Sequence, residues 1–395
     1  MKRLMALALL ACIESLFISA GAIADTILVP SQQATIQAGI DAASDGDTVL
    51  VACGTYSWES EGTGSTDGLI RLKSGIVLMS ESGDADCVVI DAQSNGRAIF
   101  CEDLDASASI VGITITGGEA TSGEDAENEG GAIRCAGGIL NLTCCRIVGN
   151  RAVYGGGVFT SGGVVNLMHC VLAENSATHG GGLYSSGTLL LADDCAFREN
   201  TVSGGEYFST GGGAYFYGAQ AVLTYCSFTR NVGVRGGGIG ANFGSVGVFM
   251  SSFAYNSGNT GGHCLILQST ADAQIWNCTL VNGDGANQNS PAIYWESAGD
   301  LEVVNSILWG DLAEQINSEP SQYVLVAGCD IQGGWEGGGN FSLYPEFCSN
   351  SHYLQSDSPC APENNPSGLL IGAFPVACGV TAVRETSWSA VKALY

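Results

Sequence analysis

Two short motifs recur along the middle of the chain with one common spacing, and this repeat restricts the folds the chain can adopt. The first is Gly-Gly followed by Gly, Ala or His, with first glycines at positions 130, 155, 180, 211, 236 and 261. The second is Cys-x-(Phe/Ile/Leu)-x-x-Asn, which begins at positions 145, 170, 195 and 226 and returns at Ser251 without the cysteine. Both motifs have one longer interval at the same place in the series, and the extra residues must lie between Thr201 and Thr210. Two motifs that stay in phase through an insertion indicate a structural repeat of about 25 residues.

Apolar residues alternate within each unit. The residues five and three positions before the cysteine position are apolar in every copy, and the alternation resumes at the cysteine after two permissive positions. The apolar pairs are Leu140 and Leu142, Val165 and Leu167, Leu190 and Ala192, Ala221 and Leu223, and Val246 and Val248. A period of two predicts short strands with one buried face, and a third strand follows the glycines, where the backbone must turn sharply. We therefore expect an all-β, single-stranded right-handed parallel β-helix, a solenoid in which each unit forms one coil.

In such a coil, equivalent residues stack at about 4.8 Å, the spacing between strands of a sheet. The repeat then predicts an asparagine ladder beside a cysteine ladder. Stacked asparagine side chains can satisfy one another and the backbone of the turn. Because the chain has no Cys-x-x-Cys pair or Cys/His cluster, we interpret the cysteines as core packing and assign no metal site. The ladder residues are Asn150, Asn175, Asn200, Asn231 and Asn256, with Cys145, Cys170, Cys195 and Cys226.

The motifs also carry a family resemblance. Gly130-Gly131-Ala132-Ile133 and the segments 197–200, 228–231 and 253–256, each Phe-x-x-Asn, resemble the GGA(I/L/V) and FxxN repeats of polymorphic outer-membrane proteins. They resemble more broadly the bacterial right-handed parallel β-helix repeat proteins. The match covers roughly residues 110–335 and implies a fold rather than an activity.

The ends of the chain predict four segments. Residues 1–24 resemble an export signal, residues 25–345 would form the β-helix with a short N-terminal capping helix, residues 346–380 a closing segment, and residues 381–395 a separate tail. A lipid anchor on Cys12 is an alternative, which the continued hydrophobicity after Cys12 disfavours. Cys348, Cys360 and Cys378 are the best disulfide candidates, and the odd number of cysteines after the signal leaves at least one free.

The charge restricts the partners. The net charge is −26, so nucleic acid and anionic membranes would be repelled. Beyond the signal, no stretch approaches the ~20 apolar residues of a membrane span. We expect a secreted or cell-surface protein with a polysaccharide or a surface protein as partner.

Catalysis is the alternative to a function in which the β-helix only presents a surface for binding. Some β-helix proteins are polysaccharide lyases or glycoside hydrolases of the pectate-lyase-like type, which need carboxylates beside a basic residue, or paired carboxylates. The chain lacks the motif series expected of a polygalacturonase and has only three lysines. We assign no catalytic residue and expect a non-catalytic binding protein without a cofactor, although Ca²⁺ would have to intervene for a polyuronate ligand.

One outward position in each coil suggests a binding strip. It holds Arg134, Phe159, Tyr184 and Tyr215 and then Gly240 and Leu265. Sugar rings stack on such strips, whereas stacked rings can also merely stabilise the sheet. A glycan site requires open ring faces. At the outward bend, His169 should lie next to Asp194 of the following coil.

Overall fold

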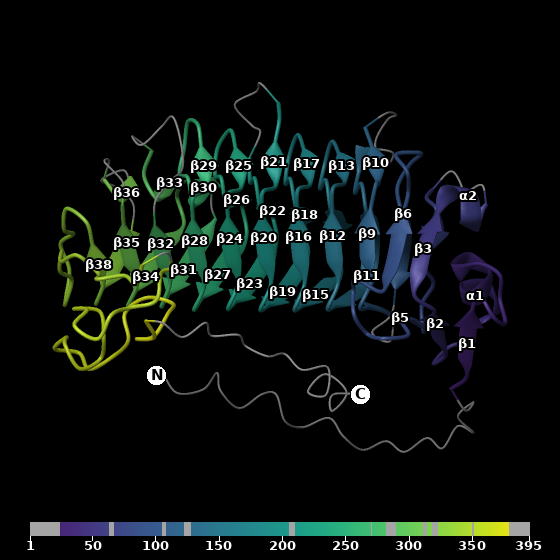
Figure 1. Cartoon of the computed structure of the whole chain (residues 1–395). Helices are drawn as coiled ribbons and strands as arrows, with labels where there is room; N and C mark the ends of the chain where they lie inside the picture. The colour runs from purple at the N-terminus through teal and green to yellow at the C-terminus, as the bar shows by residue number, and fades with distance from the viewer. Residues whose placement is uncertain are drawn as a thin grey trace, which may run out of the picture.

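The chain winds into a stack of coils bounded by parallel sheets (Figure 1). The computed structural model describes residues 24–62, 67–104, 108–121, 128–204, 210–269, 271–281, 290–310, 314–317, 323–349 and 351–378. Every pairing between the named strands is parallel, so the predicted parallel β-helix is confirmed. Residues 1–23 of the predicted export signal 1–24, with Cys12, and the predicted tail 381–395 lie outside the described residues.

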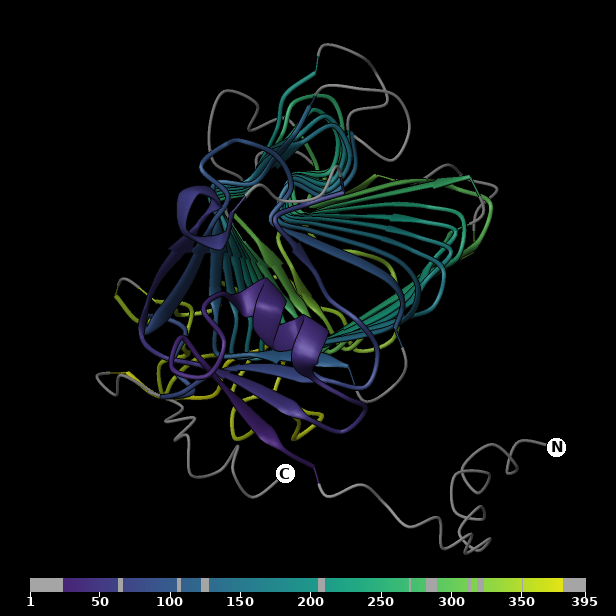
Figure 2. The same ribbon diagram turned by 90° about the vertical axis from the view of Figure 1, so that its right-hand side faces the viewer.

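Three sheets form the walls of the coil, and a narrow ridge sheet projects from one edge (Figure 2). Sheet A comprises β1 (Thr26–Val29), β2 (Thr48–Val51), β5 (Val77–Ser80), β8 (Ser109–Val111), β11 (Ile133–Thr143), β15 (Val164–Met168), β19 (Leu189–Asp193), β23 (Gln220–Thr224), β27 (Ser245–Phe249), β31 (Asp272–Trp276), β34 (Asp300–Val304) and β37 (Tyr323–Ala327). Sheet B comprises β3 (Gly54–Ser57), β6 (Val88–Asp91), β9 (Thr114–Thr116), β12 (Arg146–Val148), β16 (Val171–Ala173), β20 (Ala196–Arg198), β24 (Ser227–Thr229), β28 (Ser252–Ala254), β32 (Thr279–Val281), β35 (Ile307–Trp309) and β38 (Asp330–Ile331).

The remaining strands complete the coil after sheet B. The ridge comprises β10 (Glu119–Ala120), β13 (Arg151–Ala152), β17 (Ser176–Ala177), β21 (Thr201–Val202), β25 (Val232–Gly233) and β29 (Ser257–Gly258). Sheet C comprises the first half of β11, together with β4 (Ile70–Arg71), β7 (Ile99–Leu104), β14 (Val158–Ser161), β18 (Leu183–Ser186), β22 (Ala214–Tyr217), β26 (Ile239–Asn242), β30 (Leu265–Ser269), β33 (Ile293–Ser297) and β36 (Ile316–Asn317). Each coil thus runs through sheet A, sheet B, the ridge and sheet C.

A single residue in the left-handed conformation turns the chain from sheet A to sheet B. Glycine tolerates positive φ best, yet this corner carries side chains in coil after coil. The corner residues, all with φ between 48° and 55°, are Cys144, His169, Asp194, Tyr225, Met250, Asn277 and Asn305. The two permissive positions of the repeat thus correspond to a sharp corner, and the corner residues form a column along the molecule.

Apolar columns fill the interior. The aromatic position of the repeat forms a stack of Phe197, Phe228 and Phe253, whose rings lie nearly parallel with centroids 4.6 and 4.7 Å apart. All three rings are fully buried, as are the alternating Leu and Val residues of sheet A. Burying apolar surface in every coil is the main stabilising contribution to such a fold.

The asparagine ladder seals the turn between sheet B and the ridge. Nδ2 of Asn175 donates to Oδ1 of Asn200 at 3.0 Å and to the carbonyl of Ile147 at 2.9 Å. The backbone N–H of Asn175 also donates to Oδ1 of Asn200. The same pattern continues from Asn200 to Asn231 and from Asn231 to Asn256. Each buried amide is therefore satisfied by the neighbouring coils, as buried polar groups require.

Both ends of the stack are covered. Helix α1 (Ile36–Ala42) begins at the N-cap Thr35 and lies across the first coil, where Figure 2 shows it in front of the sheets. A Cβ at Gly39 would lie 2.9 Å from side-chain atoms of Val29 and Val49, so this helix position needs a glycine for close packing. The four-residue α2 (Trp58–Glu61) is the second helix of the described residues. At the other end, the described residues of the predicted closing segment 346–380 lie against the last coils, where Leu354 and Ile371 pack with Ile307.

The long repeat step lies where the sequence placed it. Val202 pairs with Ala177, 25 positions earlier, whereas Ala214 pairs with Leu183, 31 positions earlier. The extra residues therefore enter between β21 and Thr210, and the sheets on either side keep their register.

Candidate functional site

The predicted aromatic strip lies on the outer side of sheet C. Neighbouring coils stack its rings, with centroids 5.4 Å apart for Phe159 and Tyr184 and 5.3 Å apart for Tyr184 and Tyr215. Phe159 is only 5% exposed and Tyr215 only 7%, so these two rings lack the open faces that a glycan site requires. Tyr154 stacks on His179 just after the ridge strands, and this layer packs against Tyr184 and Tyr215. The fold-back of the ridge thus covers most of the strip.

The strip also differs from the prediction at both ends. Towards the N-terminus it continues beyond Arg134, whose guanidinium lies 5.4 Å from the centroid of the Phe100 ring and forms a 2.8 Å ion pair with Glu129. Towards the C-terminus, Gly240 pairs with Ile266 and not with Leu265. One additional residue between β29 and His263 shifts the register, because the preceding pair Gly233 and Gly258 is still 25 positions apart.

The predicted cysteine ladder lies in the core. Cys145, Cys170, Cys195 and Cys226 are buried in consecutive coils, and the thiol of Cys170 donates to the carbonyl of Leu142 at 3.4 Å. Burial, together with the neighbouring thiol of Cys195, raises the pKa of Cys170 well above its ordinary value. A protonated thiol is a poor metal ligand and nucleophile. The geometry therefore supports a packing function for this column.

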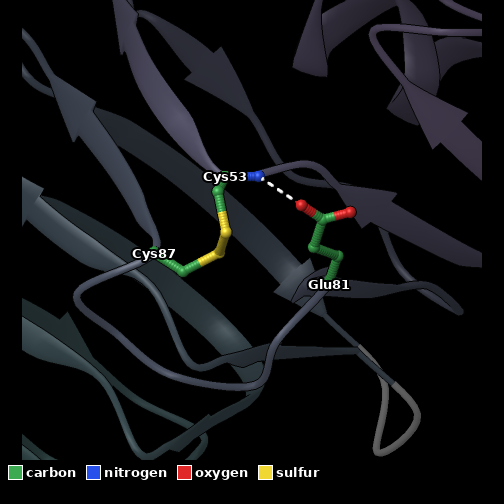
Figure 3. Close-up of side chains that lie close together, drawn as sticks. All are labelled: Cys53, Glu81 and Cys87. Carbon is green, nitrogen blue, oxygen red and sulfur yellow. Dashed lines mark hydrogen bonds between the residues drawn. A yellow bond between two sulfur atoms is a disulfide. The ribbon is translucent and has the colours of Figure 1, made fainter.

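Two disulfides link other cysteines. Cys348 pairs with Cys378, as two of the three candidates in the closing segment, whereas Cys360 remains a free thiol. Cys53 pairs with Cys87 in the first coils, a bond that sequence reasoning missed because these cysteines stand outside the 25-residue repeat. Figure 3 shows Glu81 beside this second disulfide, where its Oε1 accepts a hydrogen bond from the N–H of Cys53. The three side chains could hold a metal ion only with free thiolates, which the disulfide removes.

The corner between sheets A and B, called the A/B corner below, carries three reactive types of residue in consecutive coils. His169 Nδ1 lies 3.1 Å from Oδ2 of Asp194, which confirms the predicted neighbours. Cys144 occupies the same corner position one coil earlier, so the three residues resemble a nucleophile, a base and an orienting acid. Burial raises the pKa of Cys144 and keeps its thiol protonated. This row therefore lacks an activated nucleophile.

A groove on the outer face of sheet A is the best candidate for a ligand site. It has a volume of about 370 Å³ and crosses β19, β23, β27, β31 and β34. Its lining combines apolar, amide and carboxylate side chains, and the outward-facing members are Leu189, Gln220, Val222, Ser245, Phe249, Asp272, Gln274, Asp300 and Glu302. Five coils at about 4.8 Å each give the groove a length of roughly 20 Å along the axis of the coil.

The floor of the groove is formed by Gly247. A Cβ at this position would lie 2.7 Å from the ring of Phe249, so the missing side chain makes room for that ring. Trp276 lies beside Phe249 in the next coil, with ring centroids 5.6 Å apart and an interplanar angle of 84°. The indole is 38% exposed. The groove thus ends against an accessible aromatic pair.

Polar groups follow one side of the groove. Asp272 Oδ1 accepts a hydrogen bond from the N–H of Asp300 at 2.8 Å, and Gln274 donates to Glu302 at 3.4 Å. No Lys, Arg or His is found among the described residues that line it. The groove therefore offers hydrogen-bond acceptors, amide donors and apolar surface, but no basic group for proton abstraction.

Sequence reasoning missed this groove. Its carboxylates stand after the last complete motif, where Ser245, Asp272 and Asp300 are in register at separations of 27 and 28 positions. Alternation of Asp, Gln and Glu with buried residues in 272–276 and 300–304 was the available signal.

Neither α1 nor α2, the helices of the described residues, is long and apolar enough to cross a membrane.

No protein-family model matches the chain, and no curated protein matches its sequence. Among solved structures, pectate lyase Pel9A aligns with a TM-score of 0.49 and 12% identity over 90% of this chain and 97% of that chain. The A-module of the Azotobacter vinelandii mannuronan C-5 epimerase AlgE4 aligns with a TM-score of 0.42 and 14% identity over 82% and 98%.

A mannuronic acid-specific family 6 polysaccharide lyase from the human gut microbiota gives a TM-score of 0.25 and 14% identity over 78% of this chain and 80% of that chain. The TM-scores of these three structures are all below 0.5, so the fold of this chain is assigned from its own strand pairings. By the continuous parallel pairing of coil on coil, the chain is a parallel β-helix protein.

Proposed function

We propose that this protein is an exported, non-catalytic β-helix that binds a neutral polysaccharide in the groove of sheet A. The observation that carries the proposal is the groove itself, in which apolar side chains and the ring of Phe249 lie beside amides and carboxylates, with Trp276 in contact with that ring. Sugars present apolar ring faces and hydroxyl groups, which such surfaces can stack on and hydrogen-bond.

The shape of the groove supports a linear ligand. Its lining residues repeat from coil to coil along the axis, so a chain of similar sugar units could meet similar groups at successive positions. The carboxylates of Asp272, Asp300 and Glu302 favour a neutral glycan over a polyuronate, because like charges repel in a site without a basic residue. Export is supported by the signal-like residues 1–24 and by the two disulfides, which persist in oxidising compartments.

The chemistry of the lining supports the proposed non-catalytic function. A lyase needs a basic side chain to remove a proton, and the described lining contains none. A hydrolase could use two carboxylates, so Asp272, Asp300 and Glu302 remain the residues to test for this alternative.

Binding and cleavage should be measured on the same samples. We expect purified protein to bind one or more neutral polysaccharides in affinity electrophoresis and calorimetry without releasing reducing ends or unsaturated products. The double variant Phe249→Ala/Trp276→Ala should weaken binding roughly 10- to 100-fold, since each stacked ring contributes about 1 kcal/mol.

Tyr255→Ala is the matched control, because it removes an exposed ring from another face of the coil. Equal binding by the double variant would reject the groove. Cleavage that disappears in Asp272→Asn, Asp300→Asn or Glu302→Gln would replace the binding function with a hydrolase.

A further inference from the structure

A second pocket lies at the A/B corner, away from the groove of sheet A. Its volume is about 460 Å³, and it opens between the corner column and the closing segment. The corner contributes Asp194, Tyr225 and Met250, and sheet B contributes Ser227 and Ser252. The opposite wall comes from Tyr353 and residues 373–375.

The closing segment builds this wall by several specific contacts. Leu354 N–H donates to the carbonyl of Pro375, which joins the two stretches that carry Tyr353 and Phe374. The Cys348–Cys378 disulfide ties the same stretches together. Ala373 N–H donates to Oγ1 of Thr279 at 2.9 Å and thereby fixes the wall to sheet B. The pocket is thus held by covalent and hydrogen bonds rather than by a loose loop.

Aromatic rings line the pocket from both sides. The rings of Tyr353 and Phe374 have centroids 5.0 Å apart and are tilted by 43°, so they form an angled corner rather than a flat platform. Tyr225, which is 41% exposed, projects from the corner column. Ring faces carry negative partial charge and attract cations placed over them.

A carboxylate completes the lining. Asp194 Oδ2 faces Nδ1 of His169, and no second side chain pairs with this carboxylate in the described part of the chain. No Lys or Arg lines the described walls of the pocket. The net charge of −26 also attracts cations over the whole surface.

We propose that this pocket binds an alkylammonium group, such as a methylated amine carried by a larger ligand, between Tyr225, Tyr353 and Phe374 with Asp194 as the counter-ion. Ring faces and one carboxylate are the recognition elements that such cations require. A neutral sugar is the competing occupant, but the rings of Tyr353 and Phe374, tilted by 43°, give it no flat stacking surface.

The test compares a cation with a neutral molecule of the same shape. Choline and 3,3-dimethyl-1-butanol, which replaces the quaternary nitrogen by carbon, are titrated into the full chain and followed by NMR. We expect choline to bind at least tenfold more tightly than the alcohol. Asp194→Asn, which keeps a hydrogen-bond acceptor for His169, should weaken choline binding at least tenfold, and Tyr225→Ala should weaken it several-fold.

Tyr217→Ala serves as the control, because Tyr217 is an exposed ring on sheet C. Its choline affinity should stay within about twofold of the wild-type value. Equal binding of the two probes, or full choline affinity in Asp194→Asn, would overturn the proposal. Saturable binding of a neutral oligosaccharide that depends on Tyr225, without choline binding, would identify the pocket as a sugar site instead. Neither result bears on the groove of sheet A, which is tested by Phe249 and Trp276.

Discussion

Asp330 joins the last coil to the closing segment through a single buried carboxyl group. Oδ1 accepts a hydrogen bond from the N–H of Leu343 at 3.0 Å, and Oδ2 lies 3.2 Å from Sγ of Cys360. Burial raises the pKa of Asp330 to about 6, because the charged form loses its hydration. Cys360, which sequence reasoning placed among the disulfide candidates, thus serves as a thiol donor to this carboxylate.

The raised pKa predicts a specific pH dependence of stability. The folded chain binds this proton more tightly than the unfolded chain, so Asp330 contributes fully to stability below about pH 4 and loses that contribution as the pH rises towards 6. Asp330→Asn keeps the acceptor for Leu343 and removes the ionisation. Chemical denaturation from pH 4 to 7.5 should therefore show the variant gaining up to about 3 kcal/mol relative to wild type with rising pH. A constant difference across this range would contradict the assigned pKa.

At the scale of single elements, the asparagine ladder turns a tight turn into a continuous hydrogen-bonded column. Asn200 donates to Asn231 and to the carbonyl of Leu172, and it accepts from both the backbone and the side chain of Asn175. The residue before it, Glu199, adopts a left-handed conformation with φ 56°. The ladder therefore stabilises a backbone turn that most side chains disfavour.

Removing one asparagine of this ladder should lower the free energy of unfolding. Asn200→Leu leaves the N–H and Nδ2 of Asn175 without their acceptor in a buried site, which should lower the free energy of unfolding by about 1 to 3 kcal/mol. The same change at Asn166, a half-buried asparagine on the outer face of sheet A that donates one hydrogen bond to Asn141 at 2.8 Å, is the control and should lower it by no more than about 1 kcal/mol. Equal losses measured by denaturant titration would show that the ladder has no special contribution.

The sequence predicted those elements whose residues recur at a fixed interval. The asparagine and phenylalanine columns could be predicted because a period of 25 places them at equivalent positions. The burial of Phe159 could not, since it depends on how the ridge folds back over sheet C. Cys53 and Cys87 are 34 positions apart, and the groove residues Ser245, Asp272 and Asp300 are separated by 27 and 28 positions. A fixed period of 25 therefore aligned neither set.

At the scale of the whole molecule, each coil contacts mainly its two neighbours, and the ends need separate protection. A parallel coil would otherwise expose unpaired backbone groups at its edge. At the last coil, Ile331 N–H donates to the carbonyl of Phe341, and Asn340 Nδ2 donates to the carbonyl of Val326. At the first coil, the side chain of Gln32 accepts from the N–H of Leu28. Both edges are thus capped by nearby residues of the same chain.

Because the coils interact in sequence, loosening one end should stay local. Cys348→Ser/Cys378→Ser frees the closing segment and should raise amide hydrogen exchange in β38 and β35, with β20 unchanged. Cys53→Ser/Cys87→Ser is the mirror-image control and should raise exchange in β3 and β6 instead. Exchange that rises evenly across all coils in either variant would show that the solenoid opens as one cooperative unit.

The extra residues between β21 and Thr210 leave the sheets on both sides in register. The sheets therefore form a fixed scaffold, while the length of the loop between two strands can differ from one coil to the next. A peptide grafted between Val202 and Thr210 would be held at a defined height along the axis, and a second graft in the next coil would stand about 4.8 Å away. The ridge could thus serve as a molecular ruler for presenting paired epitopes at set separations.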